Sequence, residues 1–437
     1  MTTTNTEAED FTVAIIGGGL CGIALALALT KRSVPYRLYE ARSSFTEIGA
    51  GINIGPNTLK AFEAIDPFLG DAIYVMCSRN PAPKENVWMQ IRYGAKTAKH
   101  ADYELITELM APPTGNMAAH RNDLLSLLAS RLPQGVASFD KKLVTIDQTD
   151  SNVTLDFEDG TSATASVAIA CDGIHSSARR AILGLDDPAS VPHFVHDGAY
   201  RAMIPVRDMQ ALLGEENGRM SQVLLGPNGY IIMYAVAGGG NMNVGLWFRT
   251  PEQWTSKEWV KPHQRSEMLK DFGQWGEVAH KIMDMIPDPS FWATHCHQKQ
   301  PDHPFVGRVC LTGDSAHSMP PHQGAGAGQA MEDAYVLAEV LSKLDSTENS
   351  PSSVRCAFEA FEVIRQTRSQ EVLQSSVQAM QFWSDFHDYK KTDEQVAAFT
   401  QAAEERFVPL WKHDLIADGR AVQEEYQRRI DGARCSC

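Results

Sequence analysis

Gly17, Gly19 and Gly22 form a G-x-G-x-x-G pattern close to the start of the chain. In such a pattern the first glycine permits a tight turn and the second lets the backbone approach a pyrophosphate. The third lets a helix pack closely on a strand. The N–H groups at the start of that helix have no partners within the helix and point at the phosphates. The chemistry that this spacing indicates is the binding of a dinucleotide.

The segments around these glycines have the character that such a unit requires. Residues 11–16 are a β-branched, apolar run, which is typical of a central parallel strand. Residues 23–30 continue as an Ala/Leu-rich helix, and a second strand over 36–39 ends at Glu40. The carboxylate of Glu40 can accept a hydrogen bond from a ribose hydroxyl. We therefore predict a dinucleotide-binding unit over the first 42 residues, and these features alone do not choose between FAD and NAD.

Several later motifs occur in the order found in one family of flavoenzymes. They are Glu40-Ala41-Arg42, Gly49-Ala50-Gly51-Ile52, Pro56-Asn57, Arg121 at the start of HRNDLLSLL, the D-G-x-x-S-x-x-R-like segment 170–179, Gly313-Asp314-Ser315-Ala316-His317, and Pro320 to Gly328 (PPHQGAGAG). Over residues 11–345 the chain resembles the group A flavin-dependent aromatic hydroxylases, which include salicylate hydroxylase and fungal polyketide phenol hydroxylases. The resemblance implies FAD, bound non-covalently, as the resident dinucleotide.

The resemblance also assigns residues to the cofactor. It implies that Arg121 lies near the FAD pyrophosphate and that Asp314, after an apolar strand, accepts from a ribityl hydroxyl. The helix that opens after Gly324 would direct its N–H groups at negative charge on the reduced flavin ring. The full predicted set is Gly17, Gly19, Gly22, Glu40, Gly51, Asn53, Arg121, Asp314, Gly324, Ala325 and Ala327.

The distribution of motifs and patterns predicts an α/β fold with a discontinuous flavin domain. We expect a Rossmann-type FAD-binding domain over 1–184 and 305–345, an inserted β-sheet substrate domain over 185–304, and a C-terminal helical region over 346–437. Within the insertion we expect strands at 198–206, 222–225, 230–236 and 242–249, with a hairpin at Asn228-Gly229. Beyond the flavin motifs, the patterns of 353–381 and 392–429 are helical.

Three polar residues in the flavin motifs have more than one interpretation. His317 and His322 could suggest acid–base or metal chemistry, but a spacing of five with two prolines between them suits neither an i,i+4 metal site nor one helix face. We expect no metal, with His317 packed in the core and His322 beside the flavin ring. Arg179 either fixes the D-G loop or serves NAD(P)H.

The predicted catalytic residues are Arg201 and Tyr234, on two strands of the inserted domain. A charge within the apolar strand 199–204 is costly without a partner, so Arg201 requires an anion or a wet cavity. Period-two alternation places Tyr230 and Tyr234 on one face of their strand. In the resembling family, some fungal members hold a substrate phenolate with an Arg and a Tyr from such strands, and Tyr230 is the alternate tyrosine. The competing interpretation is structural: Arg201 pairs with a nearby Asp, and the tyrosines pack in the core.

The resemblance implies a monooxygenase reaction on a small aromatic substrate. NADH or NADPH reduces FAD, O2 adds at the flavin C4a position, and the resulting hydroperoxide transfers one oxygen to a phenol. The substrate is a salicylate-like acid or a polyketide phenol. The alternatives are an epoxidase acting on a polyketide or terpenoid alkene, and a flavin dehydrogenase without oxygen transfer.

Composition limits the partners and the compartment. The chain has 39 Lys+Arg and 54 Asp+Glu, a formal net charge of -15, which argues against nucleic acid or an anionic membrane surface. Eight cysteines without a paired framework favour a reducing, cytoplasmic location. The uncharged segment 13–29 follows acidic residues and contains three consecutive glycines, so we expect no signal peptide and no membrane span. A monomer or a homodimer fits these features.

Overall fold

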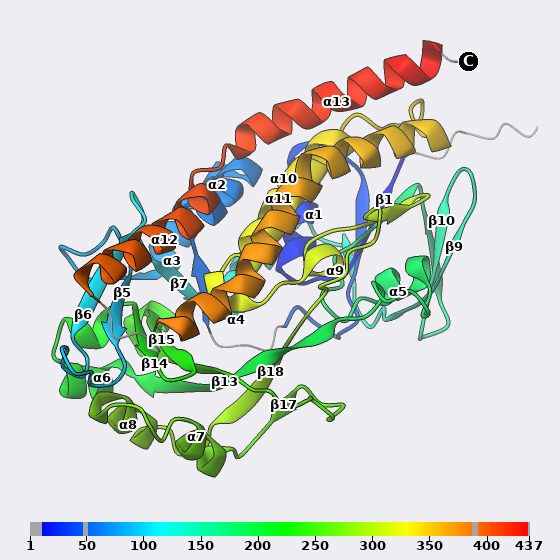
Figure 1. Ribbon diagram of the computed structural model, residues 1–437. Helices are drawn as coiled ribbons and strands as arrows, with labels where there is room; N and C mark the ends of the chain where they lie inside the picture. Colours follow the sequence, from blue (N-terminus) through cyan, green and yellow to red (C-terminus); the bar gives the residue numbers. More distant parts are fainter. Residues whose placement is uncertain (1–10, 47–50, 387–391, 436–437) are drawn as a thin grey trace, which may run out of the picture.

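The structure is a computed structural model that describes residues 11–46, 51–386 and 392–435 (Figure 1). Gly49 and Ala50, which belong to one of the flavin motifs, lie outside the described residues. Within the described part, two large β-sheets and their covering helices form a mixed α/β architecture. This architecture confirms the predicted fold class.

Six strands from distant parts of the chain form one sheet, in the order β19 (Phe305–Val306), β20 (Val309–Leu311), β12 (Val167–Ala170), β1 (Val13–Ile16), β2 (Tyr36–Tyr39) and β8 (Ala137–Ser138). β1 pairs in parallel with both β12 and β2. β20 pairs in parallel with β12, so the segment after residue 304 returns to the sheet that the first part of the chain builds. The carboxyl ends of β1, β12 and β20 therefore meet at one edge, where ligands of open α/β sheets bind.

Two helices pack together against this sheet. α1 (Leu20–Lys31) follows β1 and is buried along most of its length, because residues 23–29 are all Ala, Leu or Ile. α10 (Gly326–Leu341) packs on α1 within the same hydrophobic core. On the far side of α10 lie α11 (Pro351–Asp385) and α13 (Leu415–Cys435), which run along the outside of the molecule (Figure 1).

The second large sheet has eight strands, in the order β17 (Val260–Lys261), β18 (Ser290–Cys296), β13 (His193–Pro205), β16 (Asn241–Arg249), β15 (Gly229–Val236), β14 (Gln222–Gly226), β5 (Val87–Tyr93) and β6 (Leu105–Met110). β13 to β16 confirm the four predicted strands, and Pro227 and Asn228 form the turn between β14 and β15. β5 and β6 come from the part of the chain before residue 184, and β5 pairs in parallel with β14. The strands of this sheet are therefore not drawn from the insertion alone.

The two faces of the eight-stranded sheet pack against different layers. One face packs on α7 (Arg265–Asp271) and α8 (Glu277–Asp284), in a core that includes Tyr200 and Leu246. The opposite face carries Tyr230 and Trp247 toward α11 and α12 (Asp393–Trp411). Figure 1 shows this sheet between α7 and α8 below and the C-terminal helices above.

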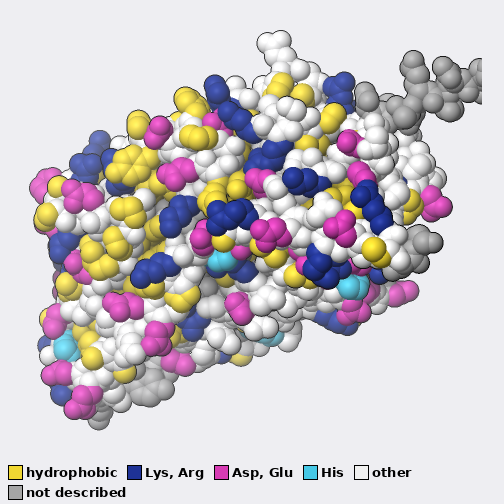
Figure 2. All heavy atoms as spheres, turned by 90° about the horizontal axis from the view of Figure 1, so that it is seen from above, with side chains coloured by type: hydrophobic (Ala, Val, Ile, Leu, Met, Phe, Trp, Pro, Cys, Tyr) yellow, Lys and Arg dark blue, Asp and Glu magenta, His cyan; other side chains and the backbone are white. Residues whose placement is uncertain are grey.

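The C-terminal region is helical, as predicted, and α12 and α13 are separated by a break after Trp411. No helix within the described ranges is long and apolar enough to cross a membrane. On the face that Figure 2 shows, Lys and Arg side chains are interspersed with Asp and Glu rather than gathered in one basic patch. Every cysteine that the structure describes is a free thiol.

The remaining elements are two small sheets and a set of shorter helices. They are β3 (Gly51–Ile54), β4 (Ser78–Arg79) and β7 (Met117–His120) in one small sheet; β9 (Leu143–Gln148), β10 (Val153–Phe157) and β11 (Ser162–Ala165) in another; and the helices α2 (Pro56–Ile65), α3 (Pro67–Met76), α4 (Arg121–Ala129), α5 (Ser177–Leu183), α6 (Val206–Leu213) and α9 (Asp314–His317).

Candidate active site

A cavity of about 780 Å³ runs from the carboxyl edge of the six-stranded sheet to the eight-stranded sheet. Both predicted catalytic residues, Arg201 and Tyr234, line it. All the predicted cofactor residues line it as well, with the exception of Gly22. The fold therefore brings residues from positions 16 to 330 of the chain around one space.

The glycine turn after β1 is shaped by two steric requirements. Gly17 has a φ of +101°, and a Cβ there would lie 2.6 Å from the carbonyl oxygen of Cys171 at the end of β12. A Cβ on Gly22 would lie 1.9 Å from the carbonyl oxygen of Gly17, so any side chain at position 22 would push α1 off the turn. Gly22 thus permits the close packing that the sequence predicted, without lining the cavity. Gly19 is the N-cap of α1 and provides no side chain to cap its first turn.

Glu40 follows β2 and is held beside the glycine turn by backbone donors. Its carboxylate accepts from the N–H of Gly18 at 2.6 Å and from the N–H of Arg42 at 2.8 Å. A carboxylate has about four acceptor positions, so these two bonds fix its direction and leave room for a ligand hydroxyl.

Arg121 and Asp314 bring opposite charges to the wall of the cavity. Arg121 begins α4 after β7, and Asp314 begins α9 after β20. Burial lowers the pKa of Arg121, and the nearby Asp314 carboxylate acts in the opposite direction.

The loop before α10 contains a second tight turn and an unsatisfied polar atom. Gly324 has a φ of +63°, and a Cβ there would lie 3.6 Å from the Cβ of Asn53 of β3. The amide oxygen of Asn53 is buried and finds no hydrogen-bond partner within the described part of the protein. The N-cap of α10, Ala325, has no side-chain acceptor for the N–H groups of the first turn. A ligand at this end of the cavity therefore meets both an unused acceptor and a helix start.

Arg201 lies on the cavity face of β13 between two aromatic rings. Its guanidinium carbon is 5.4 Å from the ring centre of Trp247 and 5.1 Å from that of Trp292, which are cation–π distances. Among the described residues no carboxylate forms an ion pair with Arg201, so the Asp partner of the competing structural interpretation is not found there. Burial lowers the pKa of Arg201, because its charged form lacks the hydration of bulk water.

The two candidate tyrosines of β15 have different surroundings. Tyr234 is 8% exposed and packs against Gly51, where a Cβ would lie 2.7 Å from its ring. Burial raises the pKa of Tyr234 to about 12, with Arg201 acting to lower it, so the hydroxyl is protonated and able to donate at neutral pH. Tyr230 instead bonds to His322.

Comparison with known proteins identifies the family. The model of the FAD binding domain family matches residues 10–376, which is most of the chain. Salicylate hydroxylase of Pseudomonas putida is 34% identical over 93% of each chain. A 6-methylsalicylate 1-monooxygenase of Aspergillus terreus is 32% identical over 95% of this chain and 92% of its own. The chain belongs to the group A FAD-dependent aromatic hydroxylases.

Solved structures agree with this assignment. A salicylate hydroxylase substrate complex is 31% identical, has a TM-score of 0.82 and covers 94% of this chain and 98% of its own. Klebsiella pneumoniae HpxO in complex with FAD and uric acid has a TM-score of 0.72 at 20% identity over 94% of this chain and 96% of its own, which supports the fold alone. The chain is thus a flavin-dependent monooxygenase of the salicylate hydroxylase family.

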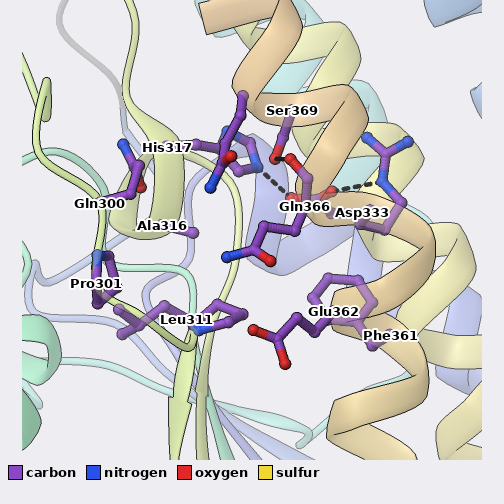
Figure 3. A pocket seen from close by; sticks show the side chains of 13 residues that line it. Gln300, Pro301, Leu311, Ala316, His317, Asp333, Phe361, Glu362, Gln366 and Ser369 are labelled. Carbon is purple, nitrogen blue, oxygen red and sulfur yellow. Dashed lines mark hydrogen bonds and ion pairs between the residues drawn. The ribbon is translucent and has the colours of Figure 1, made fainter.

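A buried ionic network supports the flavin-binding loops of this hydroxylase from behind. Asp333 of α10 accepts from the N–H of Gly313 at 3.0 Å, from His317 at 2.5 Å and from Arg365 of α11 at 2.8 Å. Burial alone would raise the pKa of Asp333, but His317 and Arg365 outweigh burial and hold that pKa well below its ordinary value. Figure 3 shows His317 and Asp333 directed toward one another beside α11. His317 is therefore a buried, hydrogen-bonded core residue, as predicted.

Sequence reasoning missed the network, although the chain contains a signal for it. Glu332 and Asp333 are adjacent acids in an otherwise apolar helix, and buried acids require partners. Arg365 donates to both of them, and Arg368 forms two further bonds to Glu332.

Arg179 of the D-G motif has a structural role in this arrangement. Its side chain is fully buried, and within the described parts of the chain it donates only to backbone carbonyl oxygens, those of Ala189, Lys299, Ser315 and Ala316. It therefore ties α5 to the start of α9, and of its two predicted roles the structure favours fixing the loop.

Proposed function

We propose that this monooxygenase is an NAD(P)H-dependent hydroxylase that binds its phenolic substrate as the phenolate, with Arg201 as the counter-ion. The observation that carries the proposal is the guanidinium of Arg201, which lines the cavity and has no carboxylate partner among the described residues. Leaving a buried charge unpaired is strongly unfavourable, so a ligand anion is the natural partner. A phenolate supplies one negative charge on a planar ring, which fits beside Trp247 in the same cavity.

The residues at the other end of the cavity fit FAD. Gly17 and Gly19 would admit its pyrophosphate, Glu40 a ribose hydroxyl, and Asp314 the ribityl chain. The buried amide oxygen of Asn53, which has no donor among the described residues, would be satisfied by an N–H of the flavin ring. The predicted set Gly22, Gly51, Arg121, Gly324, Ala325 and Ala327 would complete the cradle. Bound FAD supplies hydride acceptance from NADH or NADPH and the activation of O2.

The side chains of the sheet then act on the substrate. Arg201 favours the ionised form of the phenol, and ionisation makes the ring a better nucleophile toward an electrophilic oxygen. Tyr234, which remains protonated, donates a hydrogen bond that orients the phenolate oxygen. Trp247 and Trp292 limit the motion of the guanidinium, so it is positioned before the substrate arrives.

Two observations support a phenol over the alternative substrates. The similar enzymes named salicylate hydroxylase and 6-methylsalicylate 1-monooxygenase act on phenolic acids. An epoxidase would need no anion-binding group, so a buried cation beside the reacting ring would only destabilise its site. The substrate class is therefore a salicylate-like acid or a polyketide phenol.

The test is substrate-stimulated oxidation of NADH and NADPH, with mass spectrometry of the products. The panel contains salicylate, 6-methylsalicylate, a polyketide-type phenol without a carboxylate, and a styrene as alkene control. We expect a phenol to stimulate oxidation and to gain one oxygen atom, with or without loss of CO2. Oxygen transfer to the styrene alone would establish the epoxidase, and peroxide release equal to NAD(P)H consumption for every compound would establish a dehydrogenase.

A further inference from the structure

A buried chain of hydrogen bonds joins the eight-stranded sheet to the loop before α10. The hydroxyl of Tyr230 on β15 lies 2.8 Å from Nδ1 of His322, and Nε2 of His322 lies 3.2 Å from Oδ2 of Asp197 on β13. All three residues are buried, with exposed fractions of 2% for Tyr230, 6% for His322 and 4% for Asp197. The sequence provides no local signal for these hydrogen bonds, since the three residues lie more than 30 positions apart.

With Asp197 ionised and His322 neutral, the hydrogen bonds of the three groups run in one direction. An ionised carboxylate only accepts, so Nε2 of His322 carries the proton that points at Asp197. Nδ1 of a neutral imidazole then accepts, and Tyr230 donates to it. This is the order of the Ser-His-Asp triad, with a tyrosine hydroxyl in place of the serine.

His322 is also held at its backbone and at its ring. The indole N–H of Trp383, on α11, donates to the carbonyl oxygen of His322 at 3.3 Å. The ring of Trp247 meets the imidazole edge-on, with centres 5.0 Å apart. Oδ1 of Asp197 is buried without a hydrogen-bond partner in the described parts of the chain. The carboxylate thus retains acceptor capacity for a charged imidazole.

The hydrogen-bonded residues Tyr230 and His322 border the cavity where we place the substrate. Tyr230 and His322 line that cavity together with Arg201. Asp197 is four residues before Arg201 on β13, and period-two alternation puts both on one face. Three charged or titratable groups on the packed strands face these hydrogen-bonded residues: Arg201, Tyr234 of β15 and Cys296 of β18.

We propose that Tyr230, His322 and Asp197 form a proton relay that takes the hydroxyl proton of the phenol as the phenolate forms; this inference rests on the proposed function. The substrate O–H bond breaks, and its electron pair stays on the substrate oxygen. The proton passes to the oxygen of Tyr230, whose own proton moves to Nδ1 of His322. Asp197 stabilises the resulting imidazolium through the Nε2–H bond.

The relay complements Arg201. A guanidinium stabilises the phenolate, but it has no lone pair that could accept a proton. Burial raises the pKa of Tyr230 well above its ordinary value, so its hydroxyl is present as a proton carrier. In this scheme Tyr230 is a catalytic residue, and Asp197, which does not line the cavity, is a positioning residue that acts through His322.

The opposite face of β13 provides a matched control. There the hydroxyl of Tyr200 donates to Asp271 at 2.7 Å, in the core under α7. Tyr200 and Asp271 are thus a second Tyr–Asp arrangement on the same sheet, outside the cavity and without a histidine. If Asp197 and Tyr230 had only a structural role, their substitution should affect phenol binding no differently from substitution of Asp271 and Tyr200.

The experiment titrates FAD-loaded enzyme with 4-nitrophenol, whose phenolate is coloured, over a range of pH. We expect the wild type to bind the phenolate at a pH below that at which nitrophenol ionises in solution. Asp197→Asn and Tyr230→Phe should raise the midpoint by about one pH unit or more. Asp271→Asn and Tyr200→Phe should leave it unchanged. Retention of the flavin absorbance shows that each variant is folded, and Tyr230→Phe, which keeps the ring, carries the test if Asp197→Asn loses FAD.

A second measurement separates a relay from a structural role. Coupled hydroxylation by Asp197→Asn should recover at high pH and with more acidic phenols, because the proton then leaves without the relay. A loss that is equal at every pH would overturn the relay, and so would an unshifted midpoint in both relay variants. If the wild type binds nitrophenol only in its neutral form, the proposed phenolate site fails and the relay fails with it.

Discussion

The two sides of the loop before α10, residues 320–325, differ in how their polar groups are satisfied. Behind the loop, all four carboxylate oxygens of Glu332 and Asp333 accept hydrogen bonds, half of them from Arg365 and Arg368. In front of it, Arg201 has no ion pair and the amide oxygen of Asn53 has no donor among the residues that the structure describes. Glu332, Asp333 and Asn53 are all buried, so burial alone does not distinguish a structural polar group from one that is available to a ligand. The presence or absence of a protein partner does.

The largest effect on stability should come from disrupting the ion pairs of Glu332 and Asp333 behind the loop. Arg365→Met leaves Glu332 and Asp333 buried with a lost counter-charge, which costs roughly 3–5 kcal/mol of the free energy of unfolding. We expect a large fall in thermal midpoint and loss of FAD, measured by thermal unfolding and flavin absorbance. Arg355→Met, which removes an exposed i,i+4 pair to Glu359 on the same helix, should change stability by less than about 0.5 kcal/mol. Equal stability of the two variants would contradict the comparison.

The same network predicts a pH dependence. Because the pKa of Asp333 is held below its ordinary value, its ion pairs stabilise the protein above the pKa that this carboxyl has in the unfolded chain. That stabilisation is lost as the pH falls through the lower, folded-state pKa. The difference in unfolding free energy between wild type and Arg365→Met should therefore narrow in acid, as measured by urea titration at several pH values. A difference that widens in acid would show that another group dominates.

Replacement of Arg201, on the cavity side of the loop, should instead reduce activity and leave stability unchanged. Arg201→Ala should keep the fold and the FAD, because no protein group loses its partner, and should lose most hydroxylation. Removing one partner of a buried charge pair costs roughly 2–5 kcal/mol, here expressed in kcat/KM for the phenol. A more acidic phenol should recover part of the loss, because it ionises without help. Full coupled turnover would exclude the phenolate clamp, whereas loss of FAD or unfolding would make Arg201 structural.

The sequence predicted the parts of the site that depend on local patterns. The glycine turn, the strand before Asp314 and the helix after Gly324 each combine a motif with the element that positions it. It did not predict Arg365 or Asp197, because their roles depend on which helix or loop packs opposite them. Nor did it place β5 in the eight-stranded sheet, since parallel pairing between distant segments has no local signature.

Glu40 tests the cofactor end of the cavity, with an intermediate effect. Its carboxylate is already held by two backbone N–H groups, so replacement by Ala removes an oriented charged acceptor. The loss of a hydrogen bond to a charged group costs roughly 1.5–3 kcal/mol, so FAD should bind about ten- to a hundredfold more weakly to Glu40→Ala. Equilibrium dialysis of the apoprotein with FAD measures this directly. An unchanged affinity would show that Glu40 does not contact the ribose.

Tyr234→Phe should give the smallest effect, because it tests a single hydrogen bond from the cavity wall to the substrate. The ring packs against Gly51, and phenylalanine keeps that contact, so stability and FAD binding should remain close to the wild type. Only the hydrogen bond to the substrate oxygen is lost, which corresponds to about 1–2 kcal/mol in kcat/KM for the phenol. Combining Tyr234→Phe with Arg201→Ala in a double-mutant cycle then measures whether the two residues act on the same oxygen. Additive losses would mean that they contact different parts of the substrate, and a loss in the double variant smaller than the sum would place both on the phenolate.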